Sequence, residues 1–154
     1  MMKANYAFMA SRELKEFFKL IEEQYGKVPP LFSKLAFIRG KERIHAITRD
    51  VEKVDLQQLR INSMGLYIAE VKNGQLRLSI EGAQLVGPSA TKNVCELSDE
   101  QLREWFKGND ITIEGKYEGF AILKHGTDYV GSGKYKEGVI LNFVPKARRL
   151  LEVH

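Results

Sequence analysis

The sequence predicts an α+β protein in two parts: a helix with a small antiparallel sheet over residues 1–82, and a mostly β part with one short helix over residues 83–154. Three observations lead to this prediction. A helical stripe of apolar residues lies near the N-terminus, an Asn-Gly pair separates two strand-like runs in the middle, and further strand-like runs follow one another after residue 110. Two glycines and a proline over residues 82–90 indicate a junction between the parts.

The first helix is expected over residues 11–25, because apolar residues recur there at helical spacing. Gly26 and the two prolines that follow it end the helix. Two short strands are expected next, over residues 35–38 and 43–48, with a polar turn around Gly40 between them. The apolar stripe of the helix consists of Leu14, Phe17, Phe18, Ile21 and Tyr25.

The Asn-Gly pair at residues 73–74 favours a hairpin with a type I′ turn, because both central residues of that turn need a positive φ. A two-residue turn also sets the register of the strands. Ala69 is then expected opposite Leu78, and Tyr67 opposite Ile80, on one apolar face of the hairpin.

The second part is expected to begin with a strand over residues 93–97. Ser98 and Gln101 form a capping box, in which each side chain satisfies a backbone donor at the start of a helix that ends at Gly108. Only strand-like runs follow, with one turn at residues 126–127. These runs cover residues 111–117, 118–125, 128–135 and 138–144.

Composition narrows the class of protein. With 154 residues, of which 44% are hydrophobic, the chain is large enough to bury a core. No apolar run approaches the ~20 residues of a membrane span, and the N-terminus lacks the pattern of a signal peptide, so a cytoplasmic protein with no membrane partner is expected. One cysteine and three scattered histidines exclude disulfide and structural zinc scaffolds.

The positive charge is concentrated near the C-terminus. The formal net charge is +4, and residues 120–151 hold six basic and two acidic side chains, while the rest of the chain is balanced. A local excess of this kind favours a polyanionic partner.

Residues 131–138 contain a Gly-Ser-Gly-Lys run that could be mistaken for a phosphate-binding loop. It fits neither a Walker loop nor a dinucleotide fingerprint, since Lys134 precedes a tyrosine and no helix is expected to follow. The glycines are expected to serve a strand bend or bulge. Small residues flanked by Lys134, Tyr135 and Lys136 would also suit contact with a nucleic-acid backbone.

The run over residues 142–149 permits two interpretations, a solvated tail or a phosphate-binding segment. As a binding segment, its guanidinium and ammonium groups would pair with phosphates, while Tyr135 could stack on an unpaired base. The residues concerned are Asn142, Lys146, Arg148 and Arg149.

No catalytic constellation is found, so neither a catalytic residue, a cofactor nor a bound metal is expected. His125 and Asp128 flank the predicted turn and would form an ordinary cross-strand pair. Cys95 lies in an apolar strand, where a buried and unreactive thiol is expected. The sequence therefore predicts a protein that is not an enzyme.

Residues 119–150 resemble the PUA-like RNA-binding domain at the C-terminus of RNA cytosine-5 methyltransferases of the Nol/Nop/Sun type. The resemblance rests on Gly-x-Gly-Lys at residues 131–134 and on Asn-x-x-Pro-Lys-x-x-Arg at residues 142–149. One position departs from the family pattern, because Leu141 stands where the family has a lysine before the asparagine. The helix over residues 98–108 also fits the family.

The resemblance implies a small, partly closed β-barrel that binds structured RNA, either rRNA or tRNA. The family's catalytic cysteine follows a proline or threonine, whereas Cys95 follows Val94. The chain is thus expected to be a free-standing, non-catalytic companion of an RNA-modifying enzyme in ribosome biogenesis, with a methyltransferase or an assembly protein as a further partner. The alternative is a protein-interaction adaptor in which the N-terminal part docks that partner.

Overall fold

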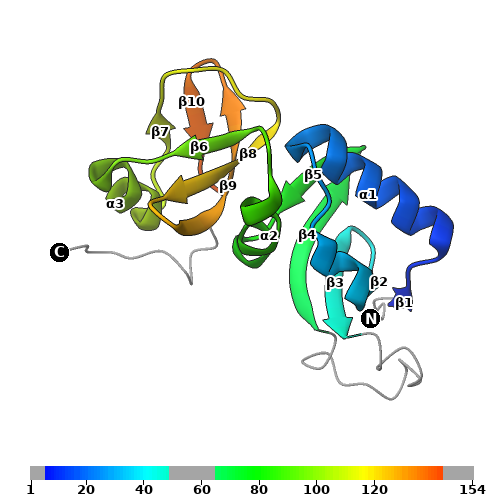
Figure 1. Cartoon of the computed structure of the whole chain (residues 1–154). Coiled ribbons are helices and arrows are strands. Elements are labelled where there is room, and N and C mark those ends of the chain that lie inside the picture. The colour runs from blue at the N-terminus through cyan, green and yellow to red at the C-terminus, as the bar shows by residue number, and fades with distance from the viewer. Residues whose placement is uncertain (1–5, 49–64, 144–154) are drawn as a thin grey trace.

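The computed structural model describes residues 6–48 and 65–143, and these residues form two five-stranded sheets joined through a short helix. Figure 1 shows the two sheets side by side, with α2 between them and α1 over the first sheet. The α+β class, with a helix and an antiparallel sheet followed by a second sheet and a short helix, is confirmed.

The first sheet is antiparallel, in the order β1-β2-β3-β4-β5. Helix α1 has the bounds expected for it, and Gly26 ends it in the left-handed conformation with φ 91°. The amphipathic stripe is confirmed, since Phe17, Ile21 and Tyr25 are buried against the sheet. The elements are β1 (Ala7–Phe8), α1 (Ser11–Tyr25), the 3₁₀ turn η1 (Pro30–Lys34), β2 (Leu35–Arg39), β3 (Arg43–Thr48), β4 (Leu66–Lys72) and β5 (Gln75–Leu78).

The hairpin register is confirmed near the turn and wrong beyond it. Ala69 faces Leu78 as expected, but β5 ends at Leu78 and Ile80 begins a helix, so Tyr67 has no partner on β5. Tyr67 faces His45 of β3 instead, across a register shift that leaves Ile68 unpaired with β3. Such a bulge reverses the alternation of side chains, which a regular period of two does not anticipate.

Residues 82–89 of the expected junction, 82–90, lie in α2 (Ile80–Val86) and in the 3₁₀ turn η5 (Gly87–Ser89) that follows it. The Ser79 hydroxyl caps α2 by accepting a hydrogen bond from the Gly82 N–H at 2.9 Å. A Cβ on Gly82 would overlap the Ile68 carbonyl oxygen, and one on Gly87 would overlap the Tyr129 ring. These glycines therefore allow other parts of the chain to pack closely against this segment.

The second sheet has the order β6-β8-β9-β10-β7, in which only β6 and β8 are parallel. The capping box is confirmed, because Ser98 and Gln101 exchange hydrogen bonds of 2.9 and 3.2 Å. The strand expected over residues 111–117 is shorter, since Gly115 has φ 95° and turns the chain away. The elements are β6 (Val94–Glu96), α3 (Asp99–Lys107), β7 (Ile111–Thr112), β8 (Phe120–His125), β9 (Asp128–Lys136) and β10 (Val139–Leu141).

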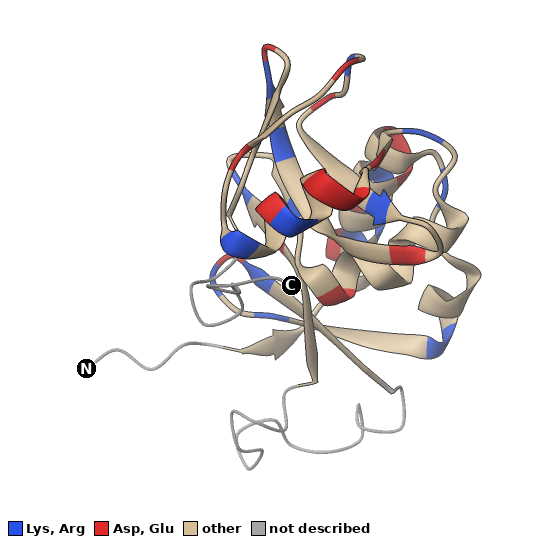
Figure 2. Ribbon diagram, turned by 90° about the vertical axis from the view of Figure 1, so that its left-hand side faces the viewer, with Lys and Arg blue, Asp and Glu red and all other residues tan. Residues whose placement is uncertain are grey.

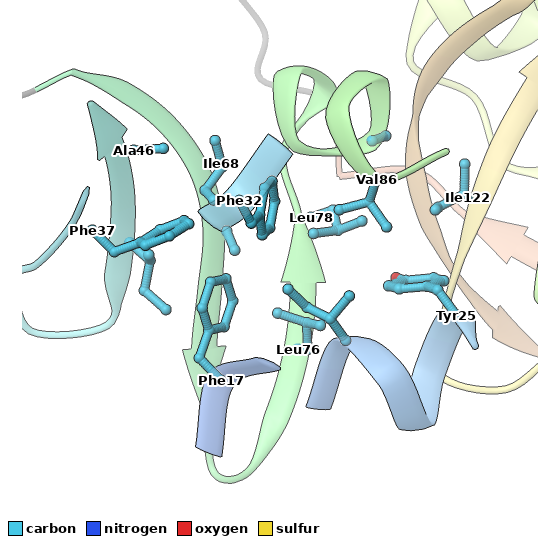
Figure 3. Close-up of a cluster of buried hydrophobic side chains, with 14 of the residues drawn as sticks. Phe17, Tyr25, Phe32, Phe37, Ala46, Ile68, Leu76, Leu78, Val86 and Ile122 are labelled. Carbon is cyan, nitrogen blue, oxygen red and sulfur yellow. The ribbon is translucent and has the colours of Figure 1, made fainter. Parts of the chain in front are cut away.

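The main hydrophobic core joins the two sheets. Figure 3 shows side chains of α1, the first sheet and α2 gathered with Ile122 of β8. Two buried hydrogen bonds cross the same boundary: the Tyr25 hydroxyl donates to the Phe120 carbonyl at 2.6 Å, and the Ser132 hydroxyl donates to the Leu78 carbonyl at 2.7 Å. A second hydrophobic core lies between α3 and the second sheet, around Trp105. The division at residue 82 stays a prediction.

None of the helices in the described ranges is long and apolar enough to cross a membrane.

We expect Tyr25→Phe to lower the free energy of unfolding by ~1–3 kcal/mol, because it removes a buried donor from the Phe120 carbonyl. Urea denaturation measures this loss. The matched control is Tyr129→Phe, since Tyr129 packs on the same core but is only partly buried, and its effect should stay within ~0.5 kcal/mol. Equal losses in both variants would contradict the role given to the Tyr25 hydroxyl.

Candidate nucleic-acid interface

The two lysines predicted on β9 share one face of that strand. Side chains alternate along a strand, so Lys134 and Lys136 lie on the same side as Ser132, whose hydroxyl reaches β5. Lys136 is exposed and Lys134 is partly buried, opposite Phe120 of β8 and Leu141 of β10. Both ammonium groups thus belong to the side of the second sheet that faces the first sheet.

The glycines of the Gly-Ser-Gly run lie under the indole of Trp105. A Cβ on Gly131 would lie 3.4 Å from the Trp105 ring, and one on Gly133 would lie 3.2 Å from the ring and would overlap the Ile140 side chain. Side chains of the protein itself, those of Trp105 and Ile140, therefore fill the space beside the two glycines. The expected bulge lies beside Gly131: Leu123 pairs with Gly131 and Lys124 with Tyr129, so Val130 is the extra residue of β9, and Gly131 has φ 134°.

Tyr135 projects from the opposite face of β9. Its hydroxyl donates to the Gly115 carbonyl at 3.1 Å, and its ring meets that of Tyr117 edge to face, with 5.9 Å between the centroids. The structure thus separates Tyr135 from the side chains of Lys134 and Lys136. Burial and the neighbouring Cys95 raise the pKa of Tyr117 to about 12, so the Tyr117 hydroxyl stays protonated at neutral pH.

Asn142 ties β10 to the end of α3. Its side-chain amide donates to the carbonyls of Trp105 and Asn109, at 2.8 and 3.0 Å, and its backbone N–H donates to the Asp110 carboxylate at 2.8 Å. Carbonyls at the end of a helix lack partners within the helix, and Asn142 supplies one. Asn142 therefore holds the start of the basic segment against α3.

Lys146, Arg148 and Arg149 lie outside the described residues, which end at Phe143. Phe143 itself is 41% exposed, and its ring lies 5.8 Å from that of Phe120. Arg77 of β5 covers the Phe143 ring at 5.0 Å and donates to the Phe143 carbonyl at 2.8 Å. The basic segment thus begins next to the first sheet, on the side that carries Lys134.

Arg77 and Phe143 are the site residues that sequence reasoning missed. The hairpin register predicts the backbone pair of Arg77 with Glu70, and the structure confirms it. Nothing in the sequence links Arg77 to a phenylalanine 66 residues later. The one sequence signal for this contact was Phe143 itself, an aromatic residue just before the basic run.

Charge does not single out this face. Figure 2 shows lysine and arginine segments interspersed with acidic ones over the ribbon. The local arrangement of the β9 lysines beside Phe143 and Arg77 is therefore more informative than the net charge of +4.

The other polar candidates have structural roles. His125 faces Asp128 in the backbone register, as expected, but its Nε2 lies 2.7 Å from the Asp99 carboxylate at the start of α3. Cys95 is buried as expected, and burial raises the pKa of its thiol, which keeps it protonated and unreactive. Within the described ranges no three His, Cys, Asp or Glu side chains come together in a way that could hold a metal ion.

Comparison with known proteins identifies a family that matches the second part of the chain. Residues 92–150 match the family described as the methyltransferase RsmF PUA domain. The chain is 33% identical over 92 residues to the ribosomal RNA small subunit methyltransferase F of Vibrio cholerae, which covers 59% of this chain and 20% of that enzyme. The predicted resemblance to the PUA-like domain of RNA methyltransferases is confirmed.

A second relative extends the similarity to the first sheet. The ribosomal RNA small subunit methyltransferase F of Aeromonas salmonicida is 26% identical over 147 residues, which cover 94% of this chain and 29% of that enzyme. The chain thus spans less than a third of the length of either relative. Both sheets together correspond to one part of the Aeromonas enzyme.

We expect Gly133→Ala to lower the free energy of unfolding by ~1–3 kcal/mol, because the added methyl group would overlap Ile140 and press on Trp105. Lys136→Ala is the control on the same strand, and its exposed side chain should contribute less than ~0.5 kcal/mol. Thermal or urea unfolding checks both variants. A Gly133→Ala variant as stable as the wild type would contradict the packing role of the glycines.

Proposed function

We propose that this chain binds structured RNA, rRNA or tRNA, as the recognition arm that accompanies an RNA-modifying enzyme in ribosome biogenesis. The observation that carries the proposal is the match of residues 92–150 to the PUA domain of an rRNA methyltransferase family. The relatives are named for the methylation of small-subunit ribosomal RNA, which makes rRNA the first substrate to test.

The phosphate contacts are assigned to one side of the second sheet. Lys134 and Lys136 lie on the face of β9 that adjoins Phe143, where the basic segment starts. Ammonium and guanidinium groups in such a row pair with phosphates and fix the register of the RNA without reading its sequence. The proposed phosphate contacts are Lys134, Lys136, Lys146, Arg148 and Arg149. Asn142 positions the segment through its side-chain hydrogen bond to the Trp105 carbonyl. Tyr135, on the other face of β9, is proposed to stack on an unpaired base.

The chain's own role is proposed to be non-catalytic. Its cysteine is buried and protonated, and the described residues offer no metal cluster for a reaction. Methyl transfer would then belong to the partner enzyme, in the cytoplasm, and the residues 83–154 would be the RNA-binding part. With labelled S-adenosylmethionine and rRNA, the purified chain should transfer no methyl group; transfer by the chain would contradict this role.

We expect the affinity for a small-subunit rRNA fragment to fall steeply with salt. The slope of log affinity against log salt is negative, and each lost single-strand phosphate contact makes it shallower by about 0.7. The variant Lys134→Ala/Lys136→Ala should therefore have a slope that is shallower by about 1.4 than that of the wild type. Fluorescence anisotropy at several potassium chloride concentrations measures the slope. Lys146→Ala/Arg148→Ala/Arg149→Ala tests the basic segment in the same way.

The matched control is Lys15→Ala/Lys19→Ala, which removes two exposed lysines from α1. Its salt slope should equal that of the wild type. Equal slopes for all variants would contradict the assigned contacts. A wild-type chain that binds no RNA would contradict the proposal and favour the adaptor, which a nuclease-resistant protein partner in a pull-down would identify.

A further inference from the structure

A cavity of about 340 Å³ opens where the two sheets meet. Its volume falls within the range of small-molecule sites. We call it the inter-sheet pocket. The apolar part of its wall comes from both sheets and from α2 and α3, namely Leu78, Ile80, Trp105 and Gly131.

Two arginine–aromatic pairs line the inter-sheet pocket. The Arg43 guanidinium lies 4.7 Å from the centre of the Tyr67 ring, and the Arg77 guanidinium lies 5.0 Å from the centre of the Phe143 ring. Flat aromatic rings and guanidinium planes are the groups on which proteins stack unpaired bases. An apolar wall with such pairs beside it therefore suits a flat heteroaromatic ring.

The bulge in β4 brings Tyr67 to this position. Because Ile68 has no partner on β3, Tyr67 joins the face of β3 and β4 that carries Arg43 and His45. The Tyr67 carbonyl accepts the Ser79 hydroxyl at 2.7 Å, which fixes the strand at the entrance to α2. The position of the Tyr67 ring is thus set by the backbone before any ligand binds.

The charges around the inter-sheet pocket balance. Glu70 lies between Arg43 and Arg77 in the registers of β3, β4 and β5, and Glu81 of α2 lines the pocket. A site for a free phosphate would need a surplus of positive charge, whereas a nucleobase is neutral and needs stacking surfaces with polar groups at its edge. The balance of charge therefore favours a base over a phosphate.

The pocket adjoins the lysines of β9. The Phe143 ring contacts Phe120, which faces Lys134 in the strand register. A strand of RNA whose phosphates follow Lys134 and Lys136 would have a neighbouring base within reach of the pocket.

We infer that the inter-sheet pocket holds one unpaired nucleobase of RNA, stacked between the Arg43–Tyr67 and Arg77–Phe143 pairs. This inference rests on the proposed RNA binding and adds the kind of RNA that is recognised. RNA with an unpaired nucleotide next to a duplex should bind more tightly than a blunt duplex.

The test compares a blunt RNA duplex with the same duplex carrying a single-stranded adenylate overhang. Tyr67→Ala should weaken binding of the overhang RNA at least about fivefold and leave binding of the blunt duplex unchanged. Arg77→Lys keeps the charge but removes the planar guanidinium, so it should weaken the same complex without changing the salt slope. Arg103→Lys on the exposed side of α3 is the control.

The only tryptophan of the chain reports on the pocket directly, because Trp105 lines it. Its fluorescence should change with the overhang RNA and not with the blunt duplex. If Tyr67→Ala and Arg77→Lys bind both RNAs like the wild type, or lose both RNAs equally, the inference is wrong while RNA binding stands. If the wild type binds neither RNA, the proposed function itself fails. Unfolding curves show that each variant is folded.

Discussion

Two buried hydrogen bonds fix how the sheets meet, and the candidate interface depends on them. The Ser132 hydroxyl binds the Leu78 carbonyl and the Tyr25 hydroxyl binds the Phe120 carbonyl, both beside the core that Ile122 shares with the first sheet. A carbonyl left without its donor in such a place costs about 1–3 kcal/mol. The sheets are therefore held in one arrangement, which keeps Phe143 beside Arg77.

The small residues of this chain serve packing between elements. Gly82 and Gly87 let α2 approach β4 and Tyr129, and the glycines of β9 make room for the indole of Trp105. In the sequence, the first pair indicates a junction between two parts and the second indicates a strand bend or bulge. A glycine has the same appearance in a sequence whether a ligand, a turn or another side chain occupies the space beside it.

What could be predicted from the sequence was local. The helix over residues 11–25, the Asn-Gly turn and the capping box at Ser98 each depend on a few neighbouring residues, and each is confirmed. Helix α2, the bulge in β4 and the contact of Arg77 with Phe143 depend on tertiary packing, which periodicity does not contain. The motif at residues 131–134 predicted the resemblance to the PUA-like domain, but it grouped Tyr135 with the lysines, because a motif does not show on which face of a strand each side chain lies.

Ultraviolet cross-linking of the chain to a small-subunit rRNA fragment, followed by mass spectrometry of the peptides, tests the central claim most directly, because it locates the RNA on the surface without a mutation. The account predicts cross-links from both sheets at one place, namely at Tyr67, Phe143 and the segment that follows Phe143. Cross-links confined to α1 or to the exposed side of α3 would contradict it, as would the absence of any cross-link.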